Sequence, residues 1–105
     1  DKLYERRWAL TVLEQALVRL QAEYAASGRG AVFEKLKGEL TSDAARAPHA
    51  EIARELDMTP GAVKVAAHRL RQRFGEVLRA EIAETVARPE DIEEEIQHLF
   101  DALGS

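Results

Sequence analysis

The stretch TPGAVKVAAHRLRQRFGEVL, residues 59–78, predicts the helix on which the interpretation of the whole chain depends. Thr59 has a hydroxyl that can cap a helix N-terminus, and Pro60 suits the first helical position because its missing N–H would have no partner there. Apolar side chains then recur at the three- and four-residue spacing of one helix face. They are Val63, Ala67, Leu70 and Phe74. The sequence therefore predicts a helix with one buried face.

The opposite face of this predicted helix is mostly cationic. With successive side chains turned by about 100° around a helix, that face carries Gly61, Val65, His68, Arg69 and Gln72, flanked by Lys64, Arg71 and Arg73. Residues 59–79 hold five cationic side chains and one acidic one, a net charge of +4, so the rest of the −4 chain carries −8. A charged face is usually only solvated. Segregation of charge, however, is typical of a protein with one face that meets phosphates.

The composition is that of one small globular domain. A chain of 105 residues with 46% hydrophobic residues is long and apolar enough to bury a single core. The absence of cysteine excludes disulfides and thiolate chemistry and fits a cytoplasmic protein. No apolar run approaches the roughly 18 residues of a membrane span, and no leader resembles a signal peptide, so we expect no membrane partner. Because the chain begins with Asp1 rather than Met, we expect it to be part of a longer protein.

Helical periodicity in the rest of the chain, without the alternation typical of strands, predicts an all-α fold. A long helix is expected over residues 2–26, a shorter one over 31–40 and a loop over 41–47. The glycines in the Ser27-Gly28-Arg29-Gly30 segment allow the left-handed backbone that ends a helix. The expected buried stripe of the long helix consists of Leu10, Leu13, Leu17, Leu20 and Tyr24.

Residues 48–78 predict a helix-turn-helix. Pro48 opens a short helix over residues 48–56, and only Asp57 and Met58 separate this helix from the cap at Thr59. Two helical patterns joined by so short a turn are typical of the motif. The small side chain of Ala53 would let the two helices cross closely.

The C-terminal part predicts an acidic amphipathic helix. The helix at residues 59–78 is expected to continue or bend as far as residue 87, where Arg88-Pro89 interrupts the pattern. A last helix starts at Pro89 and has a stripe of Ile92, Ile96, Leu99 and Leu103 beside an acidic face. We therefore expect a domain over residues 1–88 and an extension over 89–105. The extension either packs on the first helix or competes with a polyanion for the basic helix.

The run PHAEIARELDMTPGAVKVAAHRLRQRF, residues 48–74, resembles the C-terminal promoter-binding domain (region four) of bacterial RNA polymerase sigma factors of the extracytoplasmic-function (ECF) group. The shared features are an E-I-A start, a short turn, G-x-V-K and a basic H-R-x-R-x-R-F tail. The resemblance covers about residues 48–79. The stretch YERRWALTVLEQALVRLQAEY is similar to the first part of the same domain in large variants. The turn departs from the family pattern, since Asp57 stands where glycine is usual.

This resemblance implies sequence-specific binding to the −35 promoter element during transcription initiation. The basic helix would enter the major groove N-terminus first. The implied partners are promoter DNA, core RNA polymerase and an anti-sigma factor, and with so few cations we expect weak binding by this part alone. The candidates for base contacts are Lys64, His68, Arg69 and Gln72, and Val65 could touch a thymine methyl group. At the helix start, which includes the Thr59 cap and Pro60, Gly61 allows close approach and the backbone N–H groups around residues 60–62 can face a phosphate. The candidates for phosphate contacts are Arg71, Arg73 and the helix end near His49.

Other functions remain as alternatives. The three histidines lack the spacing of a metal site, and no cofactor motif or pairing of a nucleophile with a base is visible, so we expect a protein that is not an enzyme. One alternative is a helix-turn-helix module that binds only another protein. The other is an ordinary transcriptional regulator, which would normally dimerise on paired half-sites.

Overall fold

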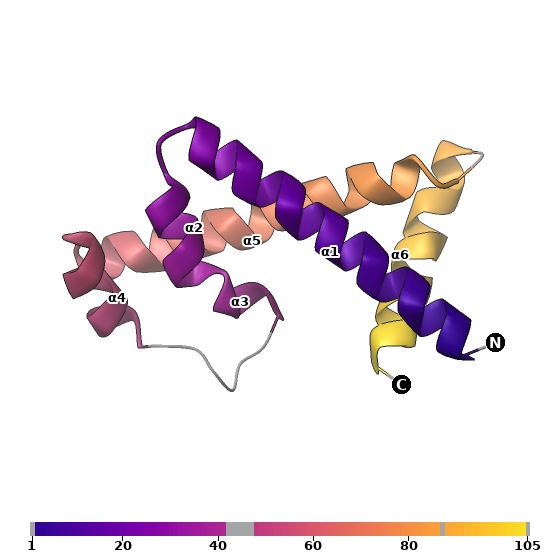
Figure 1. Cartoon of the computed structure of the whole chain (residues 1–105), viewed down its shortest axis with the longest axis horizontal. Coiled ribbons are helices and arrows are strands. Elements are labelled where there is room, and N and C mark those ends of the chain that lie inside the picture. The colour runs from indigo at the N-terminus through magenta and orange to yellow at the C-terminus, as the bar shows by residue number, and fades with distance from the viewer. Residues whose placement is uncertain (1, 42–47, 87, 105) are drawn as a thin grey trace. The chain divides into compact units, whose positions relative to one another are not determined.

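The computed structural model describes residues 2–41, 48–86 and 88–104, and its regular structure there is entirely helical (Figure 1). The elements are α1 (Lys2–Ala26), α2 (Gly30–Leu36), α3 (Gly38–Thr41), α4 (His49–Leu56), α5 (Pro60–Ala83), the 3₁₀ turn η1 (Pro89–Asp91) and α6 (Ile92–Gly104). The prediction of an all-α fold is confirmed. None of these helices is both long and apolar enough to cross a membrane.

The chain divides into two compact units. The central unit comprises residues 20–74, and the terminal unit comprises residues 1–19 and 75–105. Helices α1 and α5 each contribute residues to both units. These two units do not test the expected division into a domain over residues 1–88 and an extension over residues 89–105, which stays a prediction.

The core of the central unit forms around the first part of α5. Its predicted inward row is buried, since Val63, Ala67 and Leu70 are fully enclosed and Phe74 is nearly so. Helix α2 lies against α4 in this unit, as Figure 1 shows. Among the described residues of the unit, the other buried apolar ones are Leu20, Tyr24, Phe33, Leu36, Ile52, Ala53 and Ala66. The burial of Ala53 agrees with the close crossing expected of a small residue.

The helix predicted over residues 31–40 is interrupted in the structure. Helix α2 ends at Leu36 and the short α3 begins at Gly38. Glycine weakens a helix interior because its backbone loses more freedom on folding than that of other residues. The break also brings Glu39 to a buried position. Thr41 belongs to α3 rather than to the predicted loop, and the remainder of that loop, residues 42–47, lies outside the described residues.

The turn between α4 and α5 is made by Asp57, Met58 and Thr59. Asp57 has φ 55° and ψ 48°, the left-handed conformation that usually selects glycine. The Met58 N–H donates to the Ala53 carbonyl at 2.8 Å, which closes the end of α4. Helix α5 then begins with the predicted cap, because Thr59 Oγ1 accepts a hydrogen bond of 3.1 Å from the Ala62 N–H.

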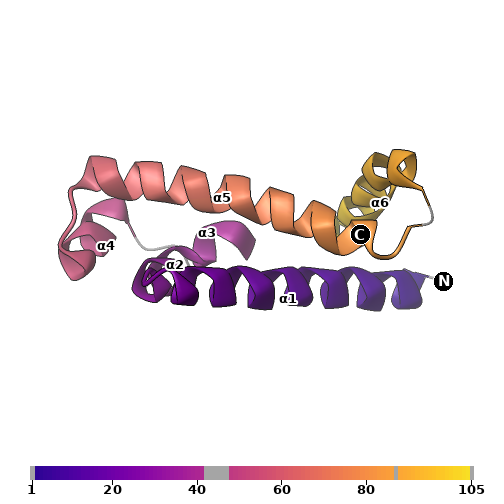
Figure 2. The ribbon, with the colours of Figure 1, turned by 90° about the horizontal axis from the view of Figure 1, so that it is seen from above.

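The order of helix, tight turn and helix is therefore present (Figure 2). Its start is slightly shifted, because Pro48 caps α4 rather than forming its first residue. The assignment of this pair to the DNA-binding helix-turn-helix class stays a prediction.

The predicted stripe of α1 is wrong in part. Leu20 and Tyr24 are buried as expected, but Leu10 is 40% exposed, and Leu13 and Leu17 are only partly covered. The structure buries instead the smaller residues Ala9, Val12 and Ala16. Two adjacent rows of α1 both satisfy the helical spacing, and only the neighbouring helices decide which row is enclosed.

The terminal unit holds the end of α5 and the whole of α6. Helix α5 runs on to Ala83 and buries Val77, Leu78 and Ile82. Arg88 is extended before Pro89, as expected for the residue preceding proline. In α6 only Leu99 of the predicted stripe is fully buried, whereas Ile92, Ile96 and Leu103 are partly covered.

Candidate nucleic-acid interface

The exposed face of α5 contains the residues predicted to contact bases. Because the row from Val63 to Phe74 is fixed in the core, the opposite row must point outward. Val65 is 48% exposed, so this face also presents an apolar side chain to solvent. The outward residues in this part of α5 include Gly61, Lys64, Val65, His68, Arg69 and Gln72, which we call the α5 face. Their predicted exposure is confirmed.

The N-terminus of α5 is also open to solvent. Thr59, Pro60 and Gly61 are all exposed. A Cβ atom added to Gly61 would meet no heavy atom within 4 Å, so packing inside the protein does not require glycine here. Glycine within a helix costs about 0.5–1 kcal/mol relative to alanine. Close approach of an external group at Gly61, as expected from the sequence, stays a prediction.

Arg71 is not free to act only as a phosphate contact, because a buried carboxylate holds it. Glu39, on α3, has a side chain that is 2% exposed. Its Oε2 accepts a hydrogen bond of 2.8 Å from Arg71 Nη1, and its Oε1 lies 2.5 Å from His49 Nε2. Both residues expected to bind phosphates near this point, Arg71 and His49, therefore connect α5 and α4 to α3. No pattern in the sequence points to this partner, since Glu39 has the position of an ordinary acidic residue in a predicted helix.

Arg73 is likewise engaged within the central unit. Its Nε and Nη2 donate to the two carboxylate oxygens of Glu23, at 2.6 and 2.9 Å. A guanidinium bound at two points to one carboxylate is geometrically fixed. Arg71 and Arg73 are both only about half exposed, so their first role is to position α5.

The described residues contain no group of three or more His, Cys, Asp or Glu side chains placed to hold a metal ion. His49 pairs with Glu39, and His98 lies on α6. His68 lies on the α5 face.

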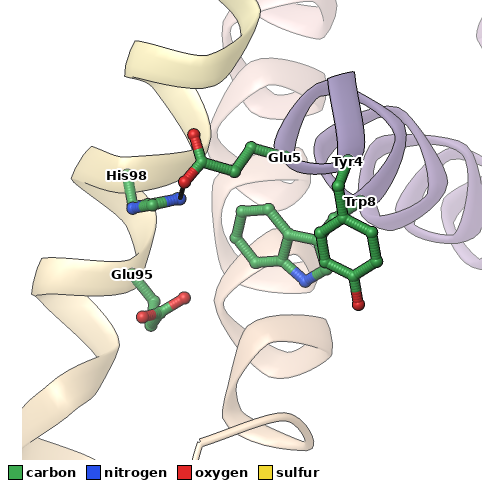
Figure 3. A pocket seen from close by; sticks show the side chains of 5 residues that line it. All are labelled: Tyr4, Glu5, Trp8, Glu95 and His98. Atoms are coloured by element: carbon green, nitrogen blue, oxygen red, sulfur yellow. Dashed lines mark ion pairs between the residues drawn. The ribbon is translucent and has the colours of Figure 1, made fainter. Parts of the chain in front are cut away.

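A hollow of about 350 Å³ lies in the terminal unit between α1 and α6 (Figure 3). Its side chains are Tyr4, Glu5 and Trp8 from α1 with Glu95 and His98 from α6. The Trp8 and His98 rings meet edge to face at 5.5 Å, and His98 Nε2 lies 3.6 Å from Glu5 Oε1. Helix α6 thus contacts the start of α1, one of the two arrangements expected from the sequence.

The acidic face of α6 also contacts the basic segment at one point. Glu93 forms an ion pair with Arg79, the last cation of residues 59–79. Arg79 lies outside the α5 face. Competition between α6 and a polyanion therefore stays a prediction.

Comparisons of the chain with models of protein families, with curated proteins and with solved structures find no match.

Proposed function

We propose that this chain is the promoter-binding module, region four, of an ECF-type sigma factor, and that the α5 face reads the −35 promoter element. The observation that carries the proposal is the content of this face. It combines cations with hydrogen-bonding and apolar groups, all exposed on a helix with its opposite side anchored in a core. On this proposal Val65 supplies an apolar contact and Gly61 supplies room for close approach, which the charged residues alone do not supply.

The side chains of the α5 face match the groups displayed in the major groove. Lys64 and Arg69 can donate to guanine O6 and N7, and Gln72 can bind adenine at two points. Val65 can contact a thymine methyl group. With the N-terminus of α5 entering first, Gly61 lets the backbone approach closely, and its N–H can face a phosphate, since Pro60 has no N–H and the Ala62 N–H is used by the cap at Thr59.

Arg71 and Arg73 have a different role in this proposal from the one expected at first. Their ion pairs with Glu39 and Glu23 hold α5 on α3 and on the end of α1. They fix the angle at which the α5 face is presented, and phosphate contact is secondary. The partners remain promoter DNA, core RNA polymerase and an anti-sigma factor, in a cytoplasmic complex.

The decisive experiment measures DNA binding by matched variants. A preferred duplex is first selected from a random pool, and its Kd and that of a scrambled duplex are then measured by fluorescence anisotropy. Lys64→Gln and Arg69→Gln should each weaken binding to the selected duplex about 5- to 150-fold, equivalent to about 1–3 kcal/mol, and the scrambled duplex less. Arg7→Gln, an exposed position in the terminal unit, makes the same charge change and should have little effect. Unchanged binding by both α5 variants, with unchanged circular dichroism, would refute the proposal.

A protein-interaction module is the second candidate, and the terminal unit favours it. Leu3, Tyr4, Val18 and Phe100 are large apolar side chains exposed in that unit. Absence of any salt-dependent DNA binding would favour this function. An ordinary regulator would instead bind palindromic half-sites as a dimer, which sedimentation analysis with and without DNA distinguishes.

A further inference from the structure

Three arginines are among the residues that line a hollow of about 340 Å³ in the central unit. Arg69 and Arg73 come from α5, and Arg29 comes from the connection between α1 and α2. The rest of the lining consists of Glu23, Tyr24 and Ser27. Arg29 is 40 residues from Arg69 in the sequence, and no sequence pattern connects them.

Two of these guanidinium groups are held in place before any ligand arrives. The Arg29 Cζ atom lies 4.9 Å from the centre of the Tyr24 ring, and that ring is buried and packs against Phe33. The Arg29 N–H donates to the Tyr24 carbonyl at 2.8 Å, after Gly28 has turned the chain through φ 77°. Arg73 is fixed by Glu23. Preorganised side chains lose little conformational entropy on binding.

The electrostatics of the hollow favour an anion. Its lining carries three positive charges and one negative charge. The negative charge is the Glu23 carboxylate, which binds Arg73 at two points. Arginine presents the same planar fork to a carboxylate and to a phosphate. A phosphoryl group of one to two negative charges therefore fits the remaining positive charge of Arg29 and Arg69.

We propose that this hollow binds a phosphoryl group, with Arg29 and Arg69 as its ligands and Glu23 as an internal competitor on Arg73. Two sources share this chemistry: a backbone phosphate of DNA and a free phosphorylated compound. The DNA source rests on the proposed function, because Arg69 belongs both to the α5 face and to the hollow, and its five N–H donors suffice for a guanine edge together with a phosphate oxygen. The phosphoryl chemistry itself does not depend on that function.

The first arm of the test uses inorganic pyrophosphate and the full chain. Arginine Nε–Hε resonances are followed by NMR during a titration. The signals of Arg29 and Arg69 should shift saturably, and Glu23→Gln should lower the Kd several-fold, because the variant removes the competing charge. Arg29→Gln should raise the Kd for pyrophosphate. Arg29→Lys keeps the positive charge but loses the planar guanidinium, so its Kd should lie between those of the unmodified chain and Arg29→Gln. Unshifted Arg29 and Arg69 signals would overturn the proposal.

The second arm measures binding to the selected duplex over a range of NaCl concentrations. Loss of one phosphate contact in Arg29→Gln should reduce the slope of log K against log[NaCl] by about one. Arg7→Gln, the matched charge change in the terminal unit, should leave the slope unchanged. Equal changes of the slope in Arg29→Gln and Arg7→Gln would mean that Arg29 acts only through general electrostatic attraction. That result would overturn a DNA phosphate as the ligand of the hollow, and it would not affect the proposal that the α5 face binds DNA. Pyrophosphate binding without any DNA binding would instead refute the proposed function and leave a site for a free phosphorylated compound.

Discussion

Glu39 Oε2 accepts a hydrogen bond of 2.8 Å from Arg71 Nη1, and this contact joins a buried carboxylate of α3 to the cationic helix α5. The two residues are 32 positions apart in the sequence. Since the Glu39 side chain is almost fully enclosed, it depends on Arg71 and His49 to satisfy its charge. The pair therefore stabilises the packing of α5 on α3, on which the orientation of the α5 face depends.

This hydrogen bond predicts that removing Arg71 and removing Glu39 lower the free energy of unfolding by different amounts. Arg71→Gln leaves the buried carboxylate with His49 alone and should lower the free energy of unfolding by about 3 kcal/mol. Glu39→Gln leaves Arg71 half exposed, where water replaces the lost partner, and should cost about 1–2 kcal/mol. Urea unfolding at pH 7 measures both values, and the double variant gives their coupling. A Glu39→Gln cost equal to or above that of Arg71→Gln would contradict this account.

Gly61→Ala should separate stability from DNA binding. The added methyl group meets nothing within 4 Å, so the helix should gain up to about 0.5–1 kcal/mol of stability. If the backbone at Gly61 approaches DNA, the same variant should bind the selected duplex more weakly. Gly75→Ala is the matched control, since Gly75 is also in α5 with no atom within 4 Å of an added Cβ. It should gain similar stability without any change in Kd. Equal DNA binding by both variants would argue against close approach at Gly61.

The left-handed turn predicts opposite effects for two substitutions of Asp57. Asp57→Gly removes the Cβ that crowds this conformation and should maintain or raise the melting temperature. Asp57→Val introduces a β-branched side chain and should cost at least about 1–2 kcal/mol. Thermal unfolding followed by circular dichroism measures both. Asp57→Asn, which tolerates the same backbone, should stay close to the natural protein.

The ion pair between α2 and α4 predicts a titration shift at high pH. The hydrogen bond that Lys35 donates to the Glu55 carboxylate, and then the negative charge of Glu55, raise the pKa of Lys35 above its ordinary value of 10.5, and the charge of Glu51 adds less. Because the folded pKa is raised, the stabilisation is complete below pH 10.5 and is lost as the pH rises through the folded pKa. An NMR titration of Lys35 should show a fall in pKa in Glu55→Gln and a smaller fall in Glu51→Gln. Equal falls would contradict the order of the two causes.

The sequence alone predicted the structure correctly where the interactions that determine it are local. The cap at Thr59, the buried row of α5 and the exposure of Lys64 and Arg69 follow from contacts within four residues and from the helical period. The start of α4 and the tight turn were predicted to within a residue for the same reason. The departure at Asp57 was tolerated because aspartate can adopt the left-handed backbone.

Only the tertiary structure decided which of two adjacent rows of α1 is buried, and where the arginines of α5 point. Glu23 lies 50 residues from Arg73 in the sequence, and such pairs form only when separate helices are brought together. The same is true of Arg29 and Arg69 around their shared hollow. Helical periodicity determines the direction in which a side chain points from its own helix. The residue that it contacts there depends on how the other helices pack against that helix.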